Sequence, residues 1–179
     1  IAKLGWALQD SGIAVVVVGA HSPGSVNLEL SQYSGLAFYA GNLHKWMLGP
    51  KGTGFGYIYP EFEEQWRPHE GSWTIFEIGH GHDKYAPGHL FAKRTLQSNC
   101  IDFANFFALA DLITWWQTTG WDFLQSQRLQ LRQTLASEIT RRLGWTRLTR
   151  EISTTPLVAF QPPPQWQGRV RELHQFLYH

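Results

Sequence analysis

The sequence predicts a mixed α/β fold, and three observations carry that prediction. The continuous apolar, β-branched run from Ile13 to Val18 is typical of a buried strand. Two more short strand candidates follow it, and apolar residues then recur at helical spacing over residues 101–118 and 121–143. A chain of 179 residues, 43% of them hydrophobic, is also long enough to bury a sizeable core.

The N-terminal residues predict a helix, because Ile1, Leu4 and Leu8 fall on one helical face before Gly12. No capping residue precedes that face, so we expect the chain to begin inside a helix and to be a piece of a longer protein. The strand over residues 13–18 is expected to be covered on both faces. It ends in the tight loop GAHSPG, at the kind of sheet edge where ligands bind in open α/β folds.

The next two strand candidates are Leu36 to Ala40 and Gly54 to Tyr59, and we expect all three to pair as neighbours. Residues 61–89 are irregular, with one helical turn in EFEEQW and a loop rich in glycine and histidine. Residues 156–160 predict a short strand, and RVRELHQFLYH predicts a final helix. We place a domain boundary between residues 145 and 146.

The charge and cysteine content exclude several classes of protein. The formal net charge is +1 and no run of like charges occurs, so we expect no nucleic-acid partner. A single cysteine, Cys100, rules out an internal disulfide framework and is interpreted as a buried structural thiol. No apolar run approaches the roughly 18 residues of a membrane span, so we expect a cytoplasmic protein without membrane contact.

Two clusters of chemically active or aromatic residues have alternative interpretations. A metal site is one interpretation of the donors His80, His82, Asp83 and His89, and a glycine-rich active-site or subunit-contact loop is the one we favour. The tryptophans at positions 115, 116 and 121 are interpreted as core or dimer-contact aromatics rather than as a ligand cage.

Lys45 lies in the stretch FYAGNLHKWMLGPKGTGFGYIY, between an expected strand and a glycine-rich segment. Trp46 and Met47 offer an apolar wall, and His44 places a second cationic or hydrogen-bonding group beside the amine. Desolvation and a nearby positive group both favour the neutral amine that imine chemistry needs. A solvated surface lysine is the alternative. GPKGTG departs from the order of a phosphate-binding P-loop and precedes a strand, so nucleotide binding is not expected.

The order of these motifs, a valine-rich strand, GAHSPG, a short strand, GNLHKW and GPKGTGFGYIY, resembles the class V aminotransferase family of fold type I pyridoxal-phosphate enzymes. That family includes cysteine desulfurases and isopenicillin N epimerase-like proteins. The resemblance runs from Ile1 to Pro60 and more loosely to about residue 150. It implies that residues 1–145 form the central part of a large domain, with a mostly parallel sheet flanked by helices and followed by long helices. Residues 146–179 would begin a small α/β domain.

The resemblance also implies site residues. Lys45 matches the lysine that forms the internal Schiff base with pyridoxal 5'-phosphate and moves protons at the substrate's α-carbon. Asn42 and His44 match positions that contact the cofactor phosphate or its surroundings. His21 matches the residue that hydrogen-bonds the cofactor's phenolic oxygen, and Thr95 matches the threonine that binds the phosphate from the neighbouring subunit. The family further implies an amino-acid substrate and a homodimer with shared active sites.

Three positions depart from the family pattern. Val18 stands where the family has the aspartate that keeps the pyridine nitrogen protonated, whereas Ala20 keeps the small side chain under the ring. Arg94 and Gln97 stand where the family commonly has glycine and aspartate.

Two functions therefore stay open. The first is a pyridoxal-phosphate enzyme acting on an amino acid as an epimerase, a C–S lyase or desulfurase, or a transaminase, with GNLHKW favouring the epimerase branch. The second is a catalytically inactive or truncated relic of the fold, acting as a structural or assembly subunit.

Overall fold

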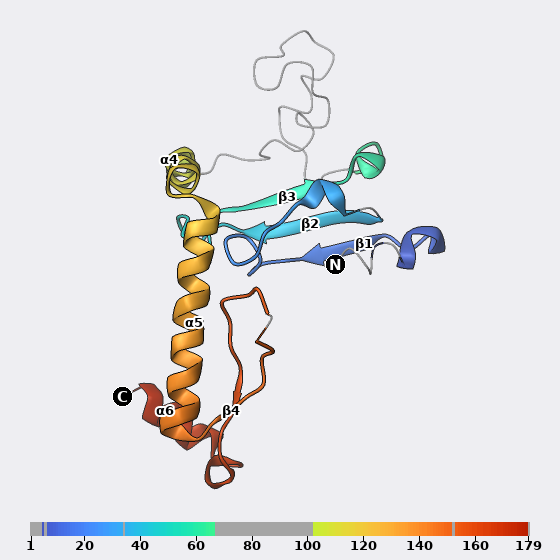
Figure 1. The fold of residues 1–179 in the computed structure, drawn as a ribbon. Helices are drawn as coiled ribbons and strands as arrows, with labels where there is room; N and C mark the ends of the chain where they lie inside the picture. Colours follow the sequence, from blue (N-terminus) through green and yellow to red (C-terminus); the bar gives the residue numbers. More distant parts are fainter. Residues whose placement is uncertain (1–4, 6, 34, 67–101, 152, 179) are drawn as a thin grey trace. The chain divides into compact units, whose positions relative to one another are not determined.

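The structure is a computed structural model that describes residues 5, 7–33, 35–66, 102–151 and 153–178. The chain divides into two compact units, Ile1–Leu112 and Ile113–His179, here called the sheet unit and the helix unit. A three-stranded sheet lies in the first and a two-stranded sheet in the second (Figure 1). The predicted α/β class is thereby confirmed. The division at residues 145 and 146 concerns the domains of the family fold and stays a prediction.

The sheet unit is built on strands β1 (Val15–Val18), β2 (Leu36–Asn42) and β3 (Gly54–Ile58), in that spatial order. β1 runs parallel to β2, and β2 runs antiparallel to β3. The three predicted strands and their pairing are confirmed. The described sheet is mixed, although a mostly parallel one was expected, because the connection over residues 43–53 is too short for the crossover that a parallel pair requires.

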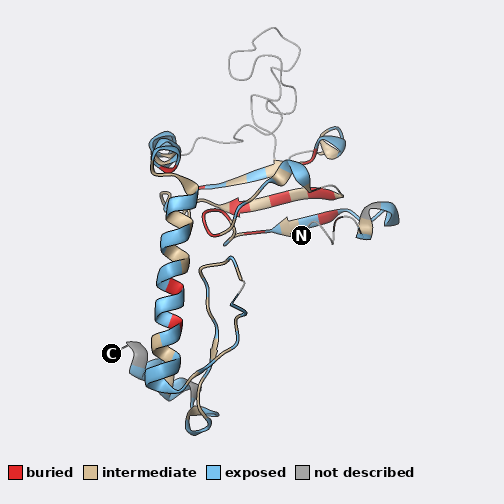
Figure 2. Ribbon diagram, in the orientation of Figure 1, coloured by how far each residue is buried: buried red, intermediate tan, exposed pale blue. Residues whose placement is uncertain are grey.

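The core of the sheet unit forms around Leu36, which is 0% exposed and packs with the buried side chains of Val15 and Tyr59. Buried residues colour much of β2 red in Figure 2. Along β1, Val16 and Val18 are instead 60% and 77% exposed. The expectation that β1 is covered on both faces is therefore wrong for the described part of the chain, in which no element covers the face that these two valines share.

Short helical turns connect the strands of the sheet unit. The predicted N-terminal helix is described only at residues 5, 7 and 8, and the 3₁₀ turn η1 (Gln9–Ser11) follows it. Gly12 then ends the turn with a φ of 70°, in the left-handed region that glycine tolerates. The turn η2 (Leu30–Gln32) precedes β2, and the turn predicted in EFEEQW is the 3₁₀ helix η3 (Pro60–Phe62).

The helix unit follows the predicted order of long helices. Its elements are α4 (Ala104–Thr119, which begins in the sheet unit), α5 (Trp121–Leu143), β4 (Thr146–Arg147), β5 (Phe160–Gln161), η4 (Pro164–Trp166) and α6 (Val170–Tyr178). The strand predicted over residues 156–160 is wrong except at its last residue, since only Phe160 and Gln161 pair with β4. Pro156 has no N–H to donate to a strand ladder. Among the described residues, none of the helices combines the length and apolar character of a membrane span.

Aromatic packing joins the end of α4 to the start of α5. The Trp116 side chain is buried, with ring centroids 5.6 Å from Trp115 and 5.5 Å from Trp121. The guanidinium carbon of Arg128 lies 5.1 Å from the Trp116 ring centroid, in cation–π geometry. Trp116 is therefore a core residue, as expected.

A buried guanidinium ties α5 to the loop that follows β4. Arg132 is 6% exposed, and its Nη1 donates to the carbonyl oxygens of Ser153 (2.5 Å) and Thr155 (2.6 Å). Its Nη2 donates to the carbonyl of Glu151 at 3.0 Å. One side chain thus supplies the donors for three loop carbonyls.

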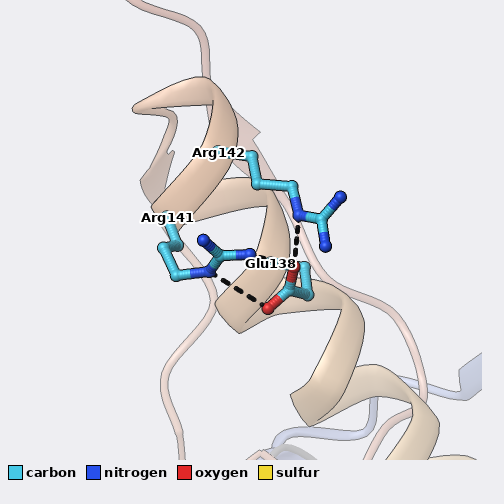
Figure 3. Close-up of polar contacts among 3 residues, drawn as sticks. All are labelled: Glu138, Arg141 and Arg142. Atoms are coloured by element: carbon cyan, nitrogen blue, oxygen red, sulfur yellow. Dashed lines mark hydrogen bonds and ion pairs between the residues drawn. The ribbon is translucent and has the colours of Figure 1, made fainter.

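The last turns of α5 carry an exposed ion-pair cluster (Figure 3). Glu138 accepts from Arg141 at 2.7 Å and from Arg142 at 2.5 Å. These two hydrogen bonds, Arg141 first, hold the pKa of the Glu138 carboxyl below its usual value. The arginines also suit the negative end of the helix dipole, but exposed pairs of this kind add little stability.

Candidate active site

The two loops predicted to carry chemistry meet at one edge of the sheet. His21 follows β1 and Lys45 follows β2, and the carboxyl ends of these parallel strands lie at the same edge. There the Lys45 Nζ lies 3.1 Å from the His21 Nε2. The imidazole is exposed and the lysine half-buried. The structure therefore brings together the two residues that sequence analysis assigned to separate motifs.

The Lys45 loop is closed by its own backbone. The N–H of Leu43 donates to the Thr53 carbonyl at 3.1 Å, and the N–H of Gly49 donates to the Leu43 carbonyl at 2.7 Å. Within the turn, Leu48 has a φ of 65° and its N–H donates to the Lys45 carbonyl at 3.0 Å. A non-glycine residue in this region is uncommon and is maintained by the surrounding contacts. The loop therefore holds the Lys45 backbone in a defined turn.

Gly24 brings the His21 loop against the Lys45 loop. It is buried with a φ of 80°, and a Cβ added there would lie 2.4 Å from the backbone carbonyl of Trp46 and 2.5 Å from the nitrogen of Met47. Only a residue without a side chain permits this approach. The contact between His21 and Lys45 thus rests on close packing of the two loops.

The other predicted residues of this edge flank Lys45. His44 is half-buried, and its Nδ1 lies 2.8 Å from the Thr53 carbonyl oxygen. Asn42 is the last residue of β2, opposite Gly54 in the ladder. Within the described part of the chain, no hydrogen bond joins Asn42 or His44 to Lys45. Asn42 thus ends the strand that leads into the Lys45 loop, and His44 lies within that loop.

Thr53 is a structural partner that the sequence analysis missed. It is buried, its hydroxyl donates to the Pro50 carbonyl at 2.6 Å, and its own carbonyl holds both Leu43 and His44. A threonine placed just after a Pro-Lys-Gly turn was the available signal, because such hydroxyls often bond back to the turn.

Several predicted residues lie outside the described residues: Thr95, Arg94, Gln97, Cys100 and the donors at positions 80, 82, 83 and 89. Their predicted roles stay predictions. Within the described ranges, no group of three or more His, Cys, Asp or Glu side chains is placed to hold a metal ion. Of the remaining two positions, Ala20 is half-buried and Val18 ends β1 with an exposed side chain.

The family assignment follows from comparison with known proteins. The family model described as aminotransferase class V matches residues 1–161. This chain belongs to the class V aminotransferase family. An isopenicillin N epimerase of Streptomyces clavuligerus is 31% identical over 160 residues, which are 86% of this chain and 40% of that protein. An isopenicillin N epimerase of Amycolatopsis lactamdurans is 39% identical over 62 residues, or 35% of this chain and 15% of that protein.

A solved structure supports the fold of this class V aminotransferase chain. The apo structure of a cysteine desulfurase from Thermococcus onnurineus NA1 matches it with a TM-score of 0.66 at 19% identity. The match covers 97% of this chain and 44% of the desulfurase, and at this identity it shows the fold alone. The chain thus spans less than half the length of the relatives that it matches.

Proposed function

We propose that this class V aminotransferase chain holds pyridoxal 5'-phosphate at the Lys45–His21 pair and contributes to a reaction of an amino acid. The supporting observation is the 3.1 Å contact between the two side chains, on loops that follow parallel strands. A primary amine beside an imidazole is a donor set that fits an aldehyde carried by an anionic cofactor. When bound, the cofactor supplies an electron sink for charge that develops at the α-carbon.

Each residue of this edge has a distinct proposed role. Lys45 would hold the aldehyde of the cofactor through its amine, as a Schiff-base lysine does, and the same amine would move a proton to or from the α-carbon. His21 exchanges a proton with Lys45 and hydrogen-bonds the phenolic oxygen. His44 and Asn42 offer an imidazole and an amide donor beside the phosphate. Thr95, from the neighbouring subunit of a homodimer, completes that phosphate site.

The binding proposal is tested by mixing the purified chain with pyridoxal 5'-phosphate and recording visible imine absorbance after desalting. We expect a stable band that borohydride reduction converts into a mass increase on Lys45. Lys45→Ala should abolish both signals, because Lys45 is the amine that lies against His21 among the residues that the structure describes. Lys51→Ala, an exposed lysine of the same loop, is the matched control and should leave the band unchanged. A band that persists in Lys45→Ala, or no band in the unmodified chain, rejects the proposal.

Among the possible reactions, we propose an epimerase-like one. Two curated relatives carry the name isopenicillin N epimerase, and the GNLHKW motif surrounds Lys45. A lysine amine that exchanges a proton with a neighbouring histidine also suits removal and return of the α-proton better than a reaction that needs a separate thiol. A panel of L-amino acids is incubated with the protein in deuterated water. Exchange of the α-hydrogen for deuterium, with both enantiomers as products, would support this branch. Release of sulfur or of a keto acid would contradict it.

Val18 stands at the position where the proposed chemistry calls for an acidic side chain. The resemblance puts an aspartate there, and valine can neither protonate nor hydrogen-bond the pyridine nitrogen. We expect Val18→Asp to raise turnover of amino acids by about ten- to a hundredfold, the value of one charge-assisted hydrogen bond. The side chain is 77% exposed, so the substitution should leave the folded state nearly unchanged. An unchanged rate on a normally folded variant would show that this position does not limit the reaction.

A second candidate is a non-catalytic subunit that keeps the fold. It is favoured by the valine at position 18, which ends β1 with an exposed side chain. This candidate predicts that the imine forms without turnover, or that it does not form at all, and that Val18→Asp changes neither result.

A further inference from the structure

Tyr39 connects β2 to the backbone of the His21 loop. The Tyr39 side chain is 0% exposed, and its hydroxyl donates to the carbonyl of Gly19 at 3.2 Å. Gly19 is the first residue after β1, and its own N–H donates to the carbonyl of Ala40 at 2.8 Å. β2 therefore holds both backbone polar groups of the residue from which the His21 loop departs.

A glycine at position 19 is a condition for this contact. A Cβ added there would lie 2.0 Å from the Tyr39 hydroxyl oxygen and 2.3 Å from the ring carbon that bears it. A buried tyrosine hydroxyl needs a hydrogen-bond partner, and the bare backbone of Gly19 lets the hydroxyl reach one. Burial raises the pKa of Tyr39, while a hydrogen bond with the Ser22 side chain lowers it by less. The phenol thus stays a neutral donor.

Hydrogen bonds within the loop connect Gly19 to His21. The Gly19 carbonyl also accepts the N–H of Ser22 at 3.0 Å, which closes the turn around His21. On the other side, the Ser25 hydroxyl donates to the His21 carbonyl at 2.5 Å. His21 therefore sits in a turn that is fixed at Gly19 and Ser25, and its ring contacts Lys45 from that turn.

We propose that Tyr39 is a positioning residue whose hydroxyl, through the Gly19 carbonyl, holds His21 against Lys45. Tyr39 is buried in the sheet unit, and among the described residues no hydrogen bond joins it to Lys45, so its effect passes through the loop. The inference deepens the proposed function, on which it rests for its significance, but the contact that it explains exists in the free chain.

The test measures the reactivity of Lys45 without cofactor. The protein is labelled with a limiting amount of acetic anhydride at several pH values, and mass spectrometry gives the labelling rate of Lys45 relative to the exposed Lys51. His21→Ala should change this ratio and its pH profile by about two- to tenfold, as expected for the loss of one hydrogen bond. Tyr39→Phe should change the labelling ratio and its pH profile in the same direction. The double variant with both substitutions should change them no more than His21→Ala does alone.

Matched variants separate positioning from a general structural effect. Tyr57→Phe removes a phenol hydroxyl from the strand residue opposite Tyr39 and should leave the ratio unchanged. Ser25→Ala removes the hydroxyl that donates to the His21 carbonyl at 2.5 Å, and should change the ratio in the same direction even if Tyr39→Phe fails to fold. An unchanged ratio in a folded Tyr39→Phe, or effects of Tyr39→Phe and His21→Ala that simply add, would overturn the inference. Because no cofactor is present, failure of the pyridoxal-phosphate proposal would not produce these results.

Discussion

Replacement of Gly24 by alanine should lower the free energy of unfolding of the sheet unit by about 2–4 kcal/mol. The left-handed backbone at this position, with a φ of 80°, accounts for one part of the loss. The larger part comes from the added methyl group, which would lie 2.4 Å from the Trp46 carbonyl. Backbone atoms of a closed loop cannot move aside as the end of a flexible side chain can, so the two loops must separate.

Gly52 provides the control for this experiment. It lies in the Lys45 loop with a φ of 82°, but a Cβ there would meet nothing within 4 Å. Gly52→Ala should therefore lower the free energy of unfolding only by the cost of the left-handed backbone, about 1 kcal/mol. Hydrogen exchange of the amides of β2 in increasing urea measures the loss in the sheet unit for both variants, and imine formation on Lys45 should be impaired only in Gly24→Ala. Equal losses in the two variants would mean that the loops do not depend on their close approach.

Replacement of Arg132 by methionine should destabilise the helix unit by about 2–4 kcal/mol. Methionine keeps most of the apolar stem and removes the donors that serve the carbonyls of Glu151, Ser153 and Thr155. Each of these carbonyls would then have to find water or remain unsatisfied. Hydrogen exchange should accelerate in residues 153–155 and in the adjoining turns of α5.

Arg141→Met is the matched control on the same helix. The Arg141 side chain is 64% exposed and pairs with Glu138 at the surface. Its loss should change stability by no more than about 0.5 kcal/mol. If the two variants behave alike, the carbonyl contacts of Arg132 contribute little, and the loop is held by other packing.

The sequence predicted the regular elements well where one local signal dominates. The β-branched run at β1 and the apolar helical spacing of α5 leave few alternatives, and both elements formed where expected. The direction of β3 was harder to predict, because it depends on the length of the connection between strands rather than on the strand residues. The strand near Phe160 is short because the N–H groups of Leu157 and Ala159 donate to the hydroxyls of Thr155 and Thr149 rather than to a strand partner.

The candidate site was predictable in composition but not in geometry. The residues Lys45, His44 and His21 stand in motifs that a reader of the sequence can single out. Their mutual placement depends on contacts between residues distant in the chain, such as Gly24 with the backbone of Trp46. No pattern within either loop encodes that contact, so sequence alone could name the amine and the imidazole but could not bring them within 3.1 Å.

The hydrogen bond between His44 and Thr53 also fixes the position of a proton. A carbonyl oxygen only accepts, so the Nδ1 that faces it must carry the hydrogen. With its hydrogen on Nδ1, the ring presents the lone pair of Nε2 to its other neighbours. A ligand at this edge of the sheet would therefore meet an acceptor nitrogen at His44, whereas the side-chain amide of Asn42 supplies a donor.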